Sequence, residues 1–255
     1  MKVSTVNLVY NAETDTIKDF YEKFHGDEIA NPVAEFMQRE RCDCLRSLLG
    51  EASGNVFIIG CGSQDEMSII NKECQGFGID ISEEAIKKSK KEYPRFYYCI
   101  SDATRLPLRE NSFDWVVCSE VIEHVQENAK ILSEVRRILR GGGIFIVTTP
   151  NWISWYGLLR KTAEKALRRP FTSGNQPVDN WSTPYSLKKK LENHGFVIDL
   201  FMGIWYYPPT GRGRKQFPPF LTYFLVRSLY RLEILCRKKL PWFGHMILFR
   251  AAMRK

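Results

Sequence analysis

The sequence has little of what zinc-bound, secreted or membrane-spanning proteins require. Its seven cysteines form no Cys-x-x-Cys pair and its four histidines show no paired spacing, which argues against a zinc site. Residues 1–15 contain no apolar segment of useful length, so secretion is not indicated. Residues 141–159 carry no charge over nineteen positions, yet they include Gly141-Gly142-Gly143 and Pro150-Asn151. These residues favour a strand, a turn and a new helix over a membrane span.

Size and composition indicate a folded chain. With 255 residues, 44% of them hydrophobic and 26% charged, the chain can bury a core without disulfides or a structural metal, which argues against disorder. Since no internal repeat or low-complexity linker divides it, we expect one domain over 1–255. Cys61, Cys99 and Cys118 lie inside apolar runs, where a reduced thiol behaves as a small hydrophobe. A reducing, cytoplasmic location is therefore expected.

Charge is divided unevenly along the chain. Residues 1–150 hold 18 Lys and Arg against 24 Asp and Glu, whereas residues 151–255 hold 19 against 5. Within the overall net charge of +8, the first part thus carries −6 and the second +14. A basic, aromatic-rich second part suits an anionic partner such as a lipid surface or RNA.

Alternating strand and helix patterns predict the fold class. Short apolar runs bounded by glycine or turn residues predict strands at 56–59, 77–80, 96–100, 113–118, 144–148, 196–202 and 246–252. Helical spacing and capping residues predict helices over 14–49 with a break at Asn31-Pro32, and over 63–71, 83–91, 127–139, 153–169, 184–193 and about 220–237. Repeated strand-helix units with buried strands indicate an α/β, doubly wound parallel sheet.

A glycine loop follows the first predicted strand. Gly60-Cys61-Gly62 would let the backbone approach a ligand closely, and Asp80, at the end of the second strand, could accept both hydroxyls of a ribose. The dinucleotide fingerprint needs a glycine where Asp65 stands, with Glu66 beside it. Two carboxylates at this place would repel a pyrophosphate, so a cofactor without phosphates fits better.

Six ordered motifs resemble those of the class I S-adenosylmethionine-dependent methyltransferases, in particular the quinone-biosynthesis-like small-molecule group. They cover about residues 40–150 and comprise VFIIGCGS at 56–63, GIDIS at 78–82, SDA with LPL between 101 and 108, SFDWVV at 112–117, EVIEHV at 120–125 and LRGGG at 139–143. A further similar stretch runs from Trp181 to Phe196. The resemblance implies a Rossmann-like sheet of seven strands with the last strand antiparallel, and S-adenosylmethionine as cofactor.

The resemblance also assigns cofactor contacts. Gly60 and Gly62 would contact the methionine moiety, Asp80 the ribose, and Asp102 the adenine amino group, with Ala103 beside it. The expected cofactor set is completed by Cys61, Ile81 and Ser119. The side chain of Cys61 is interpreted as packing, and Asp114, which opens a strand, as structural. Gln64 stands where the family often has glycine, which predicts a narrower space near the cofactor.

Glu120, Glu123 and His124 follow the fourth strand at i, i+3 and i+4, the spacing of one helix face. They could hold Mg²⁺ or a similar ion that acidifies a hydroxyl, and the pattern resembles the metal-binding motif of quinone O-methyltransferases and small-RNA 2′-O-methyltransferases. Two other interpretations stay open: His124 as a metal-free base with Glu123 beside it, or a purely structural role. The RNA enzymes have a further histidine after the fifth strand, where this chain has Pro150-Asn151-Trp152.

Three segments around the sheet are candidates for acceptor binding: a helical cap over 1–50, and insertions over 151–180 and 203–240 that flank the last strands, around a cofactor-binding core over 54–150. The helices predicted at 153–169 and 220–237 combine an apolar arc with basic residues at its margins, as helices in an anionic membrane interface do. The alternative for each is a helix packed on the domain with a solvated basic edge.

We therefore expect an S-adenosylmethionine-dependent methyltransferase acting on oxygen of a hydrophobic, lipid-linked or phosphorylated small molecule, cytoplasmic and peripheral to the inner face of the membrane, with Mg²⁺ as a further candidate cofactor. The alternatives are an RNA methyltransferase and a non-catalytic membrane-associated adaptor with the same fold. Nucleic acid ranks below a lipid-like acceptor, because the aromatic residues of the basic part sit among apolar ones. The sequence leaves the acceptor, the methylated atom and the oligomeric state open.

Overall fold

A seven-stranded sheet forms the centre of the computed structural model, which describes residues 12–24, 32–62, 65–168, 176–206, 224, 233–237 and 239–254. The strand order is β3-β2-β1-β4-β5-β7-β6, and β7 runs antiparallel to both of its neighbours. The strands are β1 (Gly54–Ile59), β2 (Cys74–Asp80), β3 (Tyr97–Ile100), β4 (Phe113–Ser119), β5 (Leu139–Pro150), β6 (Phe196–Ile204) and β7 (Met246–Met253). The predicted class and the antiparallel last strand are confirmed.

Both faces of the sheet are buried. In β1, Val56 and Ile58 belong to one hydrophobic cluster and Phe57 and Ile59 to the other, because successive side chains of a strand point to opposite faces. Such a strand is apolar at every position, which is the pattern that predicted it.

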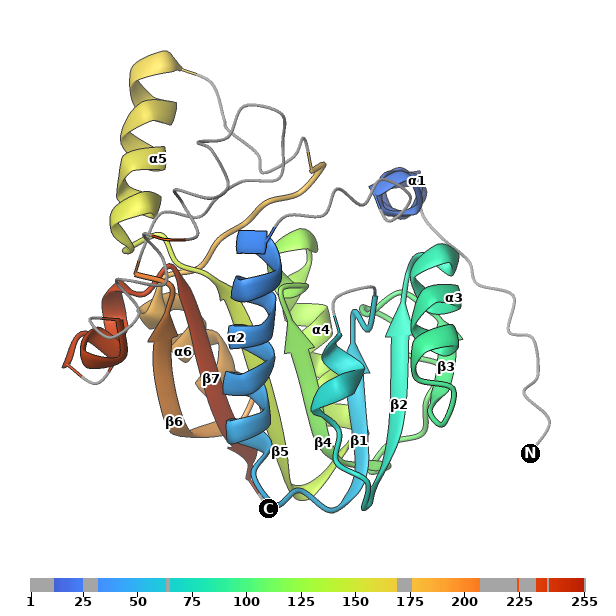
Figure 1. Cartoon of the computed structure of the whole chain (residues 1–255). Coiled ribbons are helices and arrows are strands. Elements are labelled where there is room, and N and C mark those ends of the chain that lie inside the picture. The colour runs from blue at the N-terminus through green and yellow to red at the C-terminus, as the bar shows by residue number, and fades with distance from the viewer. Residues whose placement is uncertain are drawn as a thin grey trace.

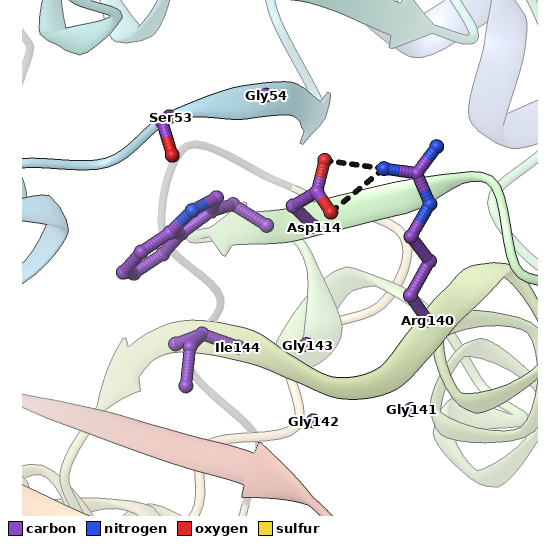
Figure 2. Close-up of a pocket in the computed structure, with 9 residues that line it drawn as sticks. Ser53, Gly54, Asp114, Arg140, Gly141, Gly142, Gly143 and Ile144 are labelled. Atoms are coloured by element: carbon purple, nitrogen blue, oxygen red, sulfur yellow. Dashed lines mark hydrogen bonds and ion pairs between the residues drawn. The ribbon is translucent and has the colours of Figure 1, made fainter.

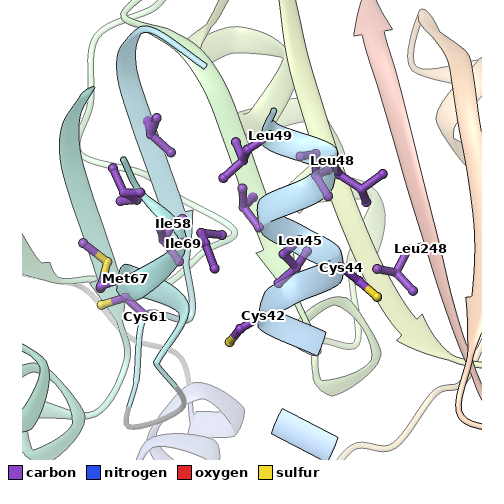
Figure 3. Close-up of a cluster of buried hydrophobic side chains, with 14 of the residues drawn as sticks. Cys42, Cys44, Leu45, Leu48, Leu49, Ile58, Cys61, Met67, Ile69 and Leu248 are labelled. Atoms are coloured by element: carbon purple, nitrogen blue, oxygen red, sulfur yellow. The ribbon is translucent and has the colours of Figure 1, made fainter. Parts of the chain in front are cut away.

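Helices cover the two faces in separate layers (Figure 1). Residues of α2 (Pro32–Leu49) and α3 (Glu83–Glu92) pack in one cluster, and residues of α4 (Asn128–Ile138) and α6 (Pro184–Asn193) pack in the other. Figure 3 shows Leu45, Leu48 and Leu49 of α2 facing Ile58 of β1 and Leu248 of β7. This arrangement leaves the carboxyl ends of β1, β2 and β4 uncovered by the two layers.

Two further helices lie beyond this carboxyl edge. Helix α1 (Ala12–Phe24) crosses above it on the β2 side, and α5 (Trp155–Leu167) extends above it on the β6 side (Figure 1). Ser154 caps α5 by accepting a hydrogen bond from the Gly157 amide, so this helix begins later than predicted. In the described part of the chain, no helix is long and apolar enough to cross a membrane.

The structure corrects one predicted helix and leaves another mostly untested. Where a helix was expected over 63–71, the described residues form only a short 3₁₀ turn, η1 (Glu66–Ile69). Asp65 is left-handed with φ 60°, and the Glu66 side chain turns to Arg41 instead of completing a capping box. Of the predicted 220–237 helix, residues 224 and 233–237 are helical and the rest lie outside the described residues, as do Ser63 and Gln64.

Candidate cofactor and acceptor site

The glycine loop turns sharply at the end of β1. The amides of Gly60 and Cys61 both donate to the Ile79 carbonyl, at 2.9 and 2.8 Å, which ties the loop to β2. Gly60 has φ +73°, and a Cβ at this position would lie 2.2 Å from Cγ2 of Val121. Only glycine satisfies both conditions, because a side chain at position 60 would be strained by the positive φ and would clash with Val121.

Asp80 lies at the carboxyl end of β2, next to this loop. Its two carboxylate oxygens accept hydrogen bonds from the amides of Gly62 and Ser82, each at 3.0 Å. Burial raises the pKa of Asp80 to about 6, against the effect of these amides. The side chain stays partly accessible, so the oxygens can accept further hydrogen bonds.

Asp102 and Ser119 occupy the neighbouring strand ends. The Ser101 amide donates to the Asp80 carbonyl at 2.9 Å, which brings the loop after β3 beside Asp80. Asp102 accepts hydrogen bonds from the amide and hydroxyl of Thr104, at 2.8 and 2.9 Å, and remains half-buried. Ser119 is buried, with its hydroxyl 3.3 Å from that of Thr148. The predicted cofactor residues therefore lie along one edge of the sheet.

The Cys61 thiol points away from this edge and into the core. It is fully buried, and a Cβ at Gly78 would come within 2.7 Å of its sulfur. Burial raises the pKa of Cys61 well above the usual range, so the thiol stays protonated. Cys61 can therefore contribute to a cofactor site through its backbone, and its side chain is packing.

Arg41 of α2 joins two loops of the site, and it was missed from the sequence. Its guanidinium contacts Glu66 at 2.6 Å and also pairs with Glu120, while its side chain is only 2% exposed. Met37, Leu45 and Leu48 share the buried face of α2 with Arg41. An arginine at a buried position of an amphipathic helix is the signal that could have revealed it, because such a charge needs a partner.

Glu123 and His124 lie in a short 3₁₀ turn, η2 (Ile122–His124), after β4. Glu123 is 1% exposed, and burial raises its pKa well above the usual range. Burial lowers the pKa of His124, so the imidazole is neutral. The ring Nδ1 lies 3.1 Å from the Val178 carbonyl, and Nε2 lies 3.8 Å from Glu123 Oε1.

The prediction that Glu120, Glu123 and His124 share a metal gains no support from their geometry. No helix carries them on one face, since they belong to η2 and its preceding turn and α4 begins only at Asn128. Glu120 has φ 52° and turns to Arg41. Among the described residues, no group of three or more His, Cys, Asp or Glu side chains could hold a metal ion. The residues present do not fit Mg²⁺.

Helix α1 contributes two residues that no sequence motif marked. Glu22 accepts hydrogen bonds from the Ser82 hydroxyl and from the Glu83 and Glu84 amides, at 3.0, 2.7 and 3.2 Å, and so caps α3. Next to it, Tyr21 lies with its ring centroid 5.9 Å from that of His124. Burial and the nearby carboxylates of Glu123 and Asp80 raise the pKa of Tyr21. Helix α1 thus places Glu22 at the start of α3 and Tyr21 beside His124.

A cavity of about 470 Å³ lies elsewhere, at the amino ends of β1, β4 and β5 (Figure 2). Arg140 pairs with Asp114 at 2.7 Å across it, and Asp114 also accepts a hydrogen bond from the Asn55 amide at 2.8 Å. These contacts hold strand ends together, as expected for a structural Asp114. Since Asp80 lies at the opposite edge of the sheet, this cavity is separate from the candidate site.

The chain is similar to known methyltransferases. A family model described as a methyltransferase domain matches residues 58–147. A probable S-adenosylmethionine-dependent methyltransferase of Mycolicibacterium smegmatis is 35% identical over 161 residues, which are 61% of this chain and 56% of that protein. The chain thus spans little more than half the length of this relative. A demethylmenaquinone methyltransferase of Symbiobacterium thermophilum is 24% identical over 173 residues, covering 56% of this chain and 68% of that protein.

Among solved structures, a SAM-dependent methyltransferase of Thermotoga maritima has the same fold, with a TM-score of 0.61, 17% identity and coverage of 92% of this chain and 95% of that one. The strand order and the antiparallel β7 agree with the family expected from the six motifs. The predicted resemblance to class I S-adenosylmethionine-dependent methyltransferases is therefore confirmed over residues 58–147.

Proposed function

We propose that this protein transfers the methyl group of S-adenosylmethionine to an oxygen of a hydrophobic, lipid-linked or phosphorylated small molecule at a membrane surface. The observation that carries the proposal is that Asp80 and the neutral imidazole of His124 both lie near Tyr21. Asp80 suits a ribose, and His124 offers a base for an acceptor hydroxyl.

The residues of the carboxyl edge fit a cofactor without phosphates. The backbone at Gly60, Cys61 and Gly62 would hold the methionine moiety, Asp80 the ribose, and Asp102 with Ala103 the adenine. The remaining members of the proposed set are Ile81 and Ser119. When bound, the cofactor supplies an electrophilic methyl group on a sulfonium. Asp65, close to the glycine loop, would disfavour a pyrophosphate in the same place.

The acceptor side is proposed to work through His124. A neutral imidazole can take the proton of a hydroxyl as its oxygen attacks a methyl group in line, and alignment of the two reactants supplies much of the rate. No metal ion is needed for this assignment, which uses only residues of this chain.

Affinity for S-adenosylmethionine is expected to depend on pH through Asp80. Because the pKa of this carboxyl is about 6 in the free protein, a proton competes with the ribose hydroxyls below that pH. Affinity measured by titration calorimetry should fall ~tenfold per pH unit below this value and stay level above it. The Asp80→Asn variant should lack the dependence, and a level wild-type profile from pH 5 to pH 8 would contradict the assignment.

A membrane surface is supported by exposed side chains at the α5 side of the edge. Trp155, Leu158 and Leu159 of α5 are exposed, as are Trp242 and Phe243 of η4 (Pro241–Phe243). The Asn151 amide group donates to the Trp242 carbonyl at 2.8 Å, which holds the start of the α5 segment beside η4. The exposed cations are Lys161 and Lys165 on α5 and Arg168 at its C-cap. Apolar anchors next to cations suit an anionic lipid interface.

Liposome flotation tests the surface. Wild-type protein should float with vesicles of phosphatidylserine and phosphatidylcholine and much less with phosphatidylcholine alone, because the cations need anionic lipid. Leu158→Glu with Leu159→Glu should abolish flotation, and Lys161→Gln with Lys165→Gln should weaken it. The matched controls are Tyr97→Glu, an exposed aromatic on β3, and Lys188→Gln with Lys189→Gln on α6. Flotation that survives both α5 changes would overturn the membrane proposal.

The chemistry is tested with S-adenosylmethionine carrying a tritiated methyl group and a cellular lipid extract as acceptor. Label should enter the organic phase, and fragmentation of the product should place the methyl on oxygen. The similarity to a demethylmenaquinone methyltransferase supports a small-molecule acceptor of this kind. Label found only in RNA would favour the RNA methyltransferase, and absence of cofactor binding would favour the adaptor.

A further inference from the structure

Residues 178–182, which we call the strap, run beside Glu123 and His124 at the acceptor side. The Val178 carbonyl lies 3.1 Å from Nδ1 of His124, and the Asn180 amide donates to the Glu123 carbonyl at 2.8 Å. The strap ends in two hydrogen bonds with the chain after β5, from the Ser182 amide to the Pro150 carbonyl and from the Trp152 amide to the Ser182 carbonyl. Both Glu123 and His124 therefore contact the strap.

Asp179 anchors the strap between these two contacts. Its carboxylate binds Arg160 of α5 at 2.9 Å and accepts a hydrogen bond from the Trp181 indole at 2.6 Å. The guanidinium of Arg160 also lies over the Trp181 ring, 4.4 Å from its centroid. The side chains of Asp179 and Arg160 are 2% and 7% exposed, so this pair is shielded from solvent. A carboxylate that is shielded from solvent and bound by two partners holds the backbone of its residue in one place.

The strap determines where His124 carries its proton. A carbonyl oxygen can only accept a hydrogen bond, so Nδ1 must be the protonated nitrogen of the neutral ring. Nε2 is then left with a lone pair, and at 3.8 Å from Glu123 Oε1 it is beyond hydrogen-bond distance of that carboxyl. Tyr21, Glu120, Glu123 and Asp179 are the ionisable groups that act on the ring or lie against it.

We propose that Asp179 is a positioning residue: by anchoring the strap to Arg160 and Trp181, it keeps the Val178 carbonyl on Nδ1 of His124 and leaves Nε2 as the acceptor of the substrate proton. The inference rests on the proposed function for its purpose. The tautomer of His124 that it predicts can be measured without an acceptor. The two proposals can therefore fail separately.

The test is long-range ¹H–¹⁵N correlation spectroscopy of the full chain with labelled histidine, recorded at pH 8. Signals of His124 are assigned by their loss in His124→Gln. In the wild type, Nδ1 should show the shift of a protonated nitrogen and Nε2 that of an unprotonated one. In Asp179→Asn, the signals should move toward the Nε2-protonated form, which a free imidazole prefers.

A matched control separates the strap from another contact of Arg160. Glu164→Gln removes the partner of Arg160 at 3.0 Å that lies on α5, and it should leave the His124 tautomer unchanged. Affinity for S-adenosylmethionine should change less than twofold in either variant, which also shows that they fold. If Asp179→Asn does not fold, Trp181→Phe removes the indole donor to Asp179, keeps an aromatic ring at this position, and should shift the tautomer in the same direction.

An Nε2-protonated His124 in the wild type, or an unchanged tautomer in a folded Asp179→Asn, would overturn the inference. Once an acceptor is in hand, Asp179→Asn should lower kcat by up to the ~100-fold that a general base commonly contributes, with KM for S-adenosylmethionine unchanged. An increase in KM for the cofactor, with kcat unchanged, would contradict a positioning role.

Discussion

Asp80→Ala is expected to weaken binding of S-adenosylmethionine about 100-fold or more, because a charge-assisted hydrogen bond to each of two ribose hydroxyls contributes about 1.5–3 kcal/mol. The same change releases the amides of Gly62 and Ser82, which the carboxylate now holds at 3.0 Å, so the glycine loop also loses its support. Titration calorimetry measures the dissociation constant directly.

The controls for Asp80 separate binding from folding. Asp80→Asn keeps one acceptor oxygen and should lie between the wild type and the alanine variant. Asp114→Asn changes a carboxylate at the opposite edge of the sheet, which pairs with Arg140, and should leave cofactor affinity unchanged. If the folded Asp80→Ala protein binds S-adenosylmethionine with a dissociation constant within threefold of the wild-type value, the assignment of the cofactor site is wrong.

Arg41→Met is expected to destabilise the fold by about 3–5 kcal/mol, since removal of one partner from a buried ion pair leaves its carboxylate uncompensated. Glu66 is the carboxylate most affected, because it is buried and lies 2.6 Å from the guanidinium. Urea unfolding, followed by circular dichroism, measures the free energy of unfolding. On the same helix, Arg46 forms an exposed pair with Asp43 and an exposed hydrogen bond to the Ser68 carbonyl, so Arg46→Met should cost less than about 1 kcal/mol.

The Arg41 effect should grow with pH. Burial already raises the pKa of Glu66 to about 8 while Arg41 opposes the rise, so loss of Arg41 raises it further. A carboxyl whose folded-state pKa is raised gives its stabilisation at low pH and loses it as pH rises through that value. The deficit of Arg41→Met should therefore be larger at pH 9 than at pH 6, and Glu66→Gln in the same protein should recover part of it. Equal deficits at both pH values would contradict the assigned partner.

The predicted sheet was confirmed where local pattern and burial agree. Residues of β1 are apolar at every position from Val56 to Ile59 because both faces of the strand are covered, and this leaves a clear signal in the sequence. The glycine at position 60 could be predicted for a related reason, because its positive φ and the nearness of Val121 exclude any other residue. In both cases the physical requirement restricts which residue types can occupy the position, so it can be recognised in the sequence.

The expected helix over 63–71 was wrong, and the expected metal group gains no support from the geometry of the described residues, for the opposite reason. Both rested on spacing along the chain, i to i+3 or i+4, which places side chains together only if a regular helix forms. Contacts with Arg41, which precedes Glu66 by 25 residues and Glu120 by 79, turned those carboxylates elsewhere. A buried charge requires its partner more strongly than a short segment requires helical geometry.

The sequence by itself determined the fold class, the glycine loop, the place of Asp80 and the similarity to methyltransferases, because each depends on residues close together along the chain or on an ordered set of motifs. Only the tertiary structure decided which side chains meet at the site. Tyr21 on His124, Glu22 on α3, and Asp179 on Arg160 join elements whose spacing follows no local rule. Folding brings such residues together through burial of the whole core, which no single segment encodes.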